Sequence, residues 1–146
     1  MISLPYPALD LIPHQAPMVF VDQITAFDAQ SIETSLKIRP DLLFCEQVGL
    51  PTWVSIEIMA QTISCYAGLQ GAKQQQAPKI GFLLGSRKLQ LPCAYFALGE
   101  TLQIRAEQQF VHEGLGQFQC EIFYRQHVLS AVLSVYEPSD AERAKL

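Results

Sequence analysis

The stretch that decides the fold, residues 53–71, reads WVSIEIMAQTISCYAGLQG and predicts one long helix. It is apolar on nearly every side, which is typical of a helix buried in a core. We expect Thr52 to cap its start, and Gly68 and Gly71 to end it. A helix of this length spans roughly 28 Å, so the remaining elements should wrap around it.

One acid, Glu57, lies within this apolar helix. At helical spacing it shares a narrow stripe with Gln61 and Ser64. A carboxylate in apolar surroundings is costly unless it has partners, and buried acids beside cavities are often functional. Two interpretations therefore stay open: a structural glutamate satisfied by Gln61 and the backbone, or a reactive group.

Strand patterns flank the helix on both sides. Two segments precede the helix, 18–27 and 31–39, and the second alternates cleanly between apolar and polar residues. Four more segments follow the helix, and they are 80–91, 101–111, 117–125 and 127–136. An antiparallel sheet of about six strands wrapped around one helix is an α+β arrangement. Because one sheet covers only one side of the helix, we expect a dimer with Glu57 near its interface.

Length and composition limit the possible functions. The 146 residues fit one domain, 1–146, in which residues 137–146 form a charged C-terminal tail. The net charge of −4 argues against nucleic-acid binding. Four cysteines without CxxC spacing indicate reduced thiols of a cytoplasmic protein, and no signal peptide or membrane-spanning stretch is visible. The three histidines lack ligand spacing, so we expect no metal and no cofactor.

Two further features have both a structural and a functional interpretation. Pro13 and Pro17 should hold His14 in a fixed loop, where the residue is either an ordinary hydrogen-bonding histidine or a proton-transfer group. Glycines interrupt the segment 80–91, which indicates either a ligand channel or tight packing against the helix.

Three stretches resemble the hotdog-fold 3-hydroxyacyl-acyl carrier protein dehydratases. Residues 11–22, LIPHQAPMVFVD, are similar to that family's opening motif, Leu-Pro-His-Arg-x-Pro followed by an apolar run and Asp. Residues 51–61, PTWVSIEIMAQ, are similar to its Pro-Gly-x-x-x-x-Glu-Ala-Met-Ala-Gln helix start, and residues 80–87, IGFLLGSR, to the strand that lines its acyl tunnel. The ApeP-like subfamily of aryl polyene gene clusters is the most similar, because its Glu-x-Met-Ala-Gln and Phe-Leu-Leu-Gly-x-Arg strings are nearly identical to those here.

One departure from the main family concerns its catalytic base. That family carries its histidine in a Gly-His-Phe-Pro motif fourteen residues before the helix glutamate, where this chain has Leu43 and no histidine nearby. Dehydration needs a base for the α-proton and an acid for the departing hydroxyl. The resemblance implies a protonated Glu57 as the acid and leaves His14 as the base.

The resemblance also implies a substrate site and partners. It suggests dehydration of a β-hydroxyacyl thioester in fatty acid or aryl polyene biosynthesis, with the backbone amide of Thr52 replacing a carbonyl-binding glycine. The expected partner is an acidic acyl carrier protein, and the only adjacent basic pair, Arg87 and Lys88, is its candidate docking site. The residues expected to bind substrate are Thr52, Trp53, Gln61, Gly81, Phe82 and Gly85. Three alternatives remain: a non-catalytic partner of another dehydratase subunit, a thioesterase, or an acyl-binding module.

Overall fold

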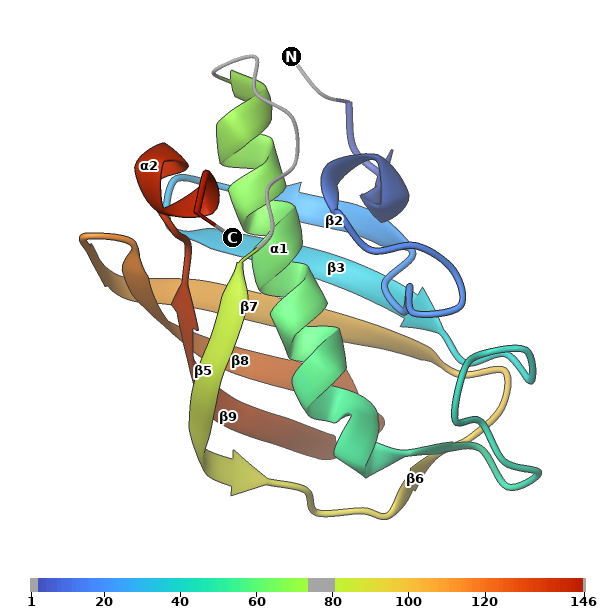
Figure 1. The fold of residues 1–146 in the computed structure, drawn as a ribbon. Coiled ribbons are helices and arrows are strands. Elements are labelled where there is room, and N and C mark those ends of the chain that lie inside the picture. Colours follow the sequence, from blue (N-terminus) through green and yellow to red (C-terminus); the bar gives the residue numbers. More distant parts are fainter. Residues whose placement is uncertain (1–2, 74–80, 146) are drawn as a thin grey trace.

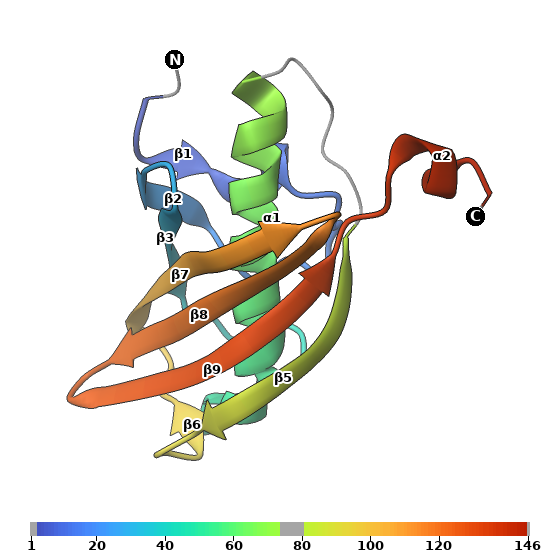
Figure 2. The ribbon, with the colours of Figure 1, turned by 90° about the vertical axis from the view of Figure 1, so that its left-hand side faces the viewer.

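The computed structural model describes residues 3–73 and 81–145. One long helix, α1 (Ser55–Lys73), packs against an antiparallel sheet that curves around one of its sides (Figures 1 and 2). In spatial order the sheet contains β1 (Tyr6–Pro7), β2 (Gln23–Phe27), β3 (Ser31–Lys37), β7 (Thr101–His112), β8 (Leu115–Tyr124), β9 (His127–Tyr136) and β5 (Phe82–Gln90).

Smaller elements complete the fold. A two-stranded sheet pairs β4 (Leu50–Pro51) with β6 (Tyr95–Phe96) near the start of α1. The short helices are η1 (Ala8–Leu11), η2 (Thr52–Val54) and α2 (Asp140–Arg143). The predicted arrangement of one helix and an antiparallel sheet is confirmed, and the sheet has seven strands because the two-residue β1 extends the six predicted ones.

The ends of α1 differ from the prediction. Thr52 is not its cap, because its hydroxyl donates to the backbone oxygen of Cys93 at 2.7 Å and η2 comes before α1. The helix also continues past Gly68 and Gly71 to Lys73. Gly68 serves close packing instead: a Cβ at this position would lie 2.0 Å from the backbone oxygen of Leu11.

The alternating patterns correctly predict which side chains face the core. Every predicted inward residue of the second strand pattern is buried, namely Ile32, Thr34, Leu36 and Ile38. In β7 the pattern fails at Phe110, which is 46% exposed, because a bulge between Gln108 and Phe110 shifts the register. The first strand pattern is also too long, since β2 begins only at Gln23.

The sheet leaves part of α1 uncovered in the single chain, as expected for a sheet that covers one side of the helix. Trp53, just before the helix, is 58% exposed, and Ala67 on the helix is also exposed. All four cysteines are free thiols, and burial raises the pKa of both Cys65 and Cys120 to about 12. Among the described residues, no helix is long and apolar enough to cross a membrane.

The charged C-terminal tail lies at the surface and contains the short helix α2. Ser139 and Glu142 form a capping box at its start, none of its residues is buried, and it follows the end of β9 away from the sheet (Figure 2). The sequence also predicts a polar loop at 73–78 after the helix, and residues 74–78 of this loop lie outside the described residues.

Candidate active site

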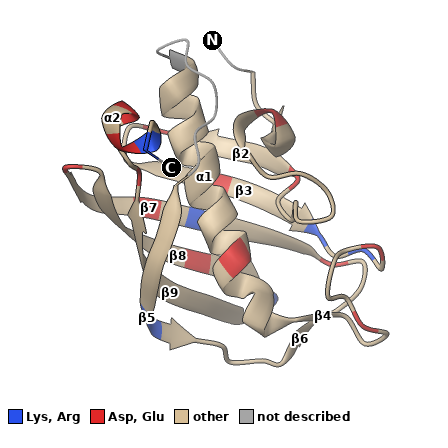
Figure 3. Cartoon of the chain, in the orientation of Figure 1, with Lys and Arg blue, Asp and Glu red and all other residues tan. Residues whose placement is uncertain are grey.

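His14 and Glu57 meet in space although 43 residues separate them in the sequence. The loop after η1 places the Nε2 atom of His14 3.5 Å from the Oε1 atom of Glu57. The two side chains are 28% and 35% exposed, so both remain accessible from one side. Glu57 is the only acidic residue of α1 and lies in its first turn (Figure 3).

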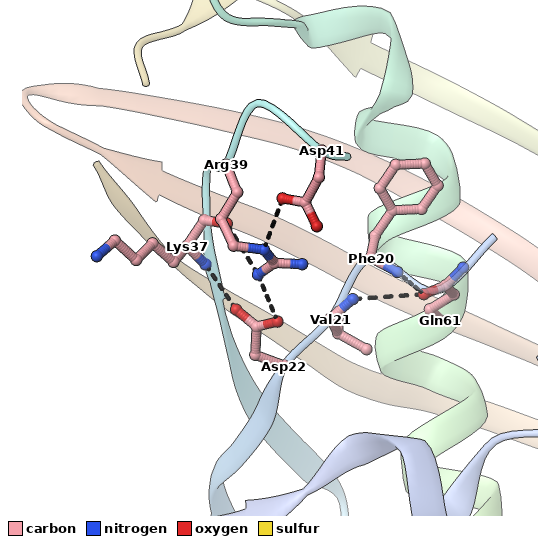
Figure 4. Close-up of polar contacts among 7 residues, drawn as sticks. All are labelled: Phe20, Val21, Asp22, Lys37, Arg39, Asp41 and Gln61. Atoms are coloured by element: carbon pink, nitrogen blue, oxygen red, sulfur yellow. Dashed lines mark hydrogen bonds and ion pairs between the residues drawn. The ribbon is translucent and has the colours of Figure 1, made fainter. Parts of the chain in front are cut away.

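Gln61 holds this arrangement together from a fully buried position. Its side-chain oxygen accepts hydrogen bonds from the backbone N–H groups of Phe20, at 2.8 Å, and Val21, at 3.4 Å (Figure 4). Its amide nitrogen donates to the backbone oxygen of Met18 and to Glu57 Oε1, the latter at 3.0 Å. Gln61 therefore ties the segment after the His14 loop to α1, and it orients the carboxylate of Glu57.

A second set of polar contacts fixes the same segment farther along (Figure 4). Asp22 accepts a hydrogen bond from the backbone N–H of Lys37 at 2.8 Å and pairs with Arg39 at 3.0 Å. Arg39 also reaches Asp41 at 3.2 Å. These contacts bind the start of β2 to the end of β3, and they leave the His14 loop anchored at its C-terminal side.

A cavity of about 460 Å³ opens beside His14 and Glu57. Small side chains of α1 form one wall, among them Ala60, Ser64 and Ala67. The opposite wall comes from the ends of four strands, with Phe82, Gln108, Val111, Gly116, Phe118, Val135 and Tyr136 among its residues. Its size is typical of cavities that enclose a small-molecule ligand.

The predicted substrate-binding residues do not all lie at one cavity. Gly81 and Phe82 line the cavity beside His14 and Glu57, whereas the buried Gln61 and Gly85, on β5, are not among the residues that line it. Thr52 and Trp53 line a separate, open hollow at the start of α1. The backbone N–H of Thr52 donates to the oxygen of Ala94 at 3.0 Å, so this group is already engaged.

The basic pair lies on β5, at the edge of the sheet. Arg87 donates a hydrogen bond to the side chain of Gln117, on β8, at 2.9 Å. Lys88 has a positive φ of 56°, where the register of β5 shifts. Both side chains are exposed, in a strand whose every residue is exposed in the single chain.

Sequence reasoning overlooked most of the cavity wall. Ser64 had a signal, since it shares the stripe of Glu57, but Tyr136 and Gln108 had none, because they reach the cavity only through the pairing of distant strands. Among the described residues, no group of three or more His, Cys, Asp or Glu side chains could hold a metal ion.

Comparison with protein families decides the relationship. The family model for the ApeP-like proteins, described as ApeP dehydratase, matches residues 6–145. The chain belongs to the ApeP-like dehydratase family. The comparison with curated proteins gave no match.

Solved structures agree with this family assignment. The ApeP-like chain is similar to a chain of the dehydratase heterocomplex ApeI:P from Xenorhabdus doucetiae, with 28% identity, a TM-score of 0.86, and coverage of 99% of this chain and 97% of that one. The Escherichia coli PaaI protein has 15% identity, a TM-score of 0.58, and coverage of 82% and 80%. A thioesterase from Staphylococcus aureus has 13% identity, a TM-score of 0.60, and coverage of 79% and 92%. The last two show the fold alone, and the fold is the hotdog fold.

Proposed function

We propose that this ApeP-like chain takes part in removing water from a 3-hydroxyacyl thioester delivered by an acyl carrier protein. The observation that carries the proposal is the 3.5 Å approach of His14 Nε2 to Glu57 Oε1 at the edge of a cavity of about 460 Å³. A histidine and a carboxylic acid are a suitable base and acid for such a reaction. Family membership supports the same reaction class.

In the proposed reaction, the two groups act on neighbouring carbon atoms. His14 Nε2 takes the proton from the α-carbon, and the electrons of that C–H bond form the new double bond to the β-carbon. The bond between the β-carbon and its hydroxyl oxygen breaks, and Glu57 gives this oxygen a proton so that it leaves as water. Gln61, bonded to Glu57 at 3.0 Å, holds the carboxyl group in position.

The proposal includes a second dehydratase subunit. The similar Xenorhabdus chain belongs to a heterocomplex, and β5 of this chain ends the sheet with every residue exposed. The free outer edge of such a strand readily accepts another strand. The Nδ1 atom of His14 is buried and has no hydrogen-bond partner among the described residues, so a group from a second subunit would complete the site.

The carrier protein would dock through charge. Carrier proteins are acidic, and Arg87 and Lys88 offer adjacent positive charges in the second half of β5, which the proposal leaves outside the contact of Phe82–Leu84 with the second subunit. Replacing both residues with Glu should lower the affinity for the carrier protein, and this difference from the wild type should be smaller at high salt.

The test is mass spectrometry of a 3-hydroxyacyl-carrier protein after incubation with the purified chain, alone and with its co-expressed second subunit. We expect loss of one water from the substrate. Glu57→Gln and His14→Ala should each reduce the rate at least a hundredfold, the scale typical of a lost acid or base. His112→Ala, a change at an 80% exposed histidine on a hairpin, should leave the rate unchanged.

Two outcomes would contradict the roles proposed for these residues. Wild-type turnover in His14→Ala would remove His14 as the base. Activity that requires the second subunit, and that neither substitution lowers, would favour a structural partner that stabilises a fully equipped dehydratase. Release of free thiol without an unsaturated product would favour a thioesterase.

A further inference from the structure

The far wall of the cavity is built where four strands begin or end. Phe82 opens β5, Tyr136 ends β9, and the two residues are register partners. Figures 1 and 2 show this meeting point beside the middle of α1, whereas Glu57 is in the first turn of α1. The residues of α1 that line the cavity run from Glu57 to Gly71, about 21 Å at 1.5 Å per residue.

A hydrogen bond to the C-terminal segment, residues 139–143, holds Tyr136 in this wall. Its hydroxyl donates to the carboxylate of Glu142, with both oxygens 2.6 Å away. Glu142 is itself fixed, because it accepts from the backbone N–H of Ser139 at 3.1 Å and closes the capping box of α2. Arg143 donates to the backbone oxygen of Pro138 at 3.1 Å, which holds α2 close to the end of β9.

The ring of Tyr136 lies against a glycine of the same wall. A Cβ built on Gly114 would be 3.2 Å from the Cε1 atom of Tyr136 and 2.5 Å from the backbone oxygen of Glu137. Gly114 has a φ of 84°, and its oxygen accepts from the N–H of Glu137 at 2.9 Å. The ring is therefore held on one side by the β7–β8 hairpin and at its hydroxyl by α2.

We propose that Tyr136, positioned by Glu142, limits the length of the acyl chain that the cavity accepts. This inference rests on the proposed function, because the cavity that Tyr136 lines is continuous with the His14 and Glu57 pair. The thioester carbon would lie at that pair, and the acyl chain would follow the small side chains of α1 toward the strand ends. The C-terminal segment would then hold in place the residue at which the acyl chain stops.

The expected measurement follows from the hydrophobic effect. Each methylene buried in an apolar cavity raises affinity about fourfold, and the rise ends where the chain meets a wall. S-alkyl pantetheine thioethers of increasing length are suitable probes, because they bind without being dehydrated. Isothermal titration calorimetry with the full chain, together with its second subunit if one co-purifies, should show the rise and the length at which it stops.

Four variants test the position of that stop. Tyr136→Ala should move it to longer chains, and Tyr136→Trp should move it to shorter ones. Glu142→Ala should act in the same direction as Tyr136→Ala, while Glu142→Gln should keep the wild-type length, because its amide oxygen can still accept the bond. Lys145→Ala, an exposed change in the same segment, serves as the matched control and should have no effect.

The two Tyr136 variants are expected to change the maximum chain length in opposite directions, so either variant alone tests the inference if the other fails to fold. An unchanged stop in whichever Tyr136 variant folds, measured beside the wild type, would overturn the inference. The inference would also be overturned if none of the thioethers bound to the chain. Because the probes are not turned over, a chain that binds them with the expected length limit but shows no dehydration would reject the proposed reaction alone.

Discussion

Gln61 is the residue on which the geometry of the candidate site depends. Both ends of its side-chain amide are in use, with the oxygen bonded to the N–H of Phe20 and the nitrogen bonded to Met18 and Glu57. The sequence places Gln61 on the stripe of Glu57 and suggested a substrate contact. It could not reveal the direction of the side chain, because the partner backbone lies about forty residues earlier in the chain.

A Gln61→Leu substitution should therefore destabilise the fold and slow turnover together. It leaves the N–H of Phe20 buried without a partner, which costs about 1–3 kcal/mol, and it releases the segment that follows His14. Urea unfolding would measure the loss of stability, and the dehydration assay would measure the loss of rate. Gln47→Leu, at an exposed position, is the control, and an equal free energy of unfolding in both variants would contradict this role.

At the scale of the elements, Gly68 decides how the N-terminal segment meets α1. The backbone oxygen of Leu11, at the end of η1, occupies the space that a side chain on residue 68 would need. Three residues later the same segment carries His14. The closeness of helix and segment thus contributes to placing the histidine above the helix face that carries Glu57.

We expect Gly68→Ala to destabilise the protein, although alanine is the better helix former by about 1 kcal/mol. The added methyl group would lie 2.0 Å from Leu11 O, so the segment must move, and overpacking of this kind costs about 1–3 kcal/mol. Thermal unfolding would measure the change. Gly85→Ala, where a methyl group meets nothing within 4 Å, should be tolerated; equal melting temperatures for the two variants would contradict the packing role.

The longer elements could be predicted from the sequence, and the shorter ones could not. Alternation identified β3, β7 and β8 with nearly correct bounds, because one face of each packs on the core. The two-residue strands β1, β4 and β6 have no pattern of their own and exist only through distant pairing partners. The helix α2 did have a signal, since the spacing of Ser139 and Glu142 is that of a capping box.

The candidate site was predictable only in part, for the same reason. The apolar setting of Glu57 and the prolines around His14 marked the two residues, and the resemblance paired them. Their separation of 3.5 Å, and the cavity beside them, depend on contacts between segments far apart in the chain. The resemblance alone also suggested Thr52 and Trp53, which the structure locates at another hollow.

At the scale of the whole molecule, β5 is where this chain should meet its partner. The strand ends the sheet, and its large apolar side chains are exposed, with Phe82 and Leu83 each 42%, Leu84 59% and Leu89 40% accessible. Such a row of apolar residues on a strand with a free outer edge is typical of a surface covered by another subunit. One side of α1 is also uncovered, as shown by the exposed Ala67.

A charge on this strand should prevent assembly without unfolding the chain. We expect Leu84→Lys to shift the protein from its assembled form to single chains, because a buried lysine at a subunit contact is costly. Size-exclusion chromatography with light scattering would give the mass, and circular dichroism would verify the fold. The control is Val128→Lys, which puts the same charge on β9 at a position that is 44% exposed, and this variant should assemble like the wild type. If the Leu84→Lys protein still assembles, the proposed contact at β5 is ruled out.

The outer edge of β5, which has no partner strand among the described residues, makes the single chain prone to aggregation during its synthesis. Free N–H and C=O groups along an apolar strand bond to any similar strand, including that of a misfolded or newly made neighbour. A chain synthesised in excess of the proposed second subunit would leave this edge uncovered and would aggregate. Synthesis of the chain together with that subunit would keep the edge covered from the start.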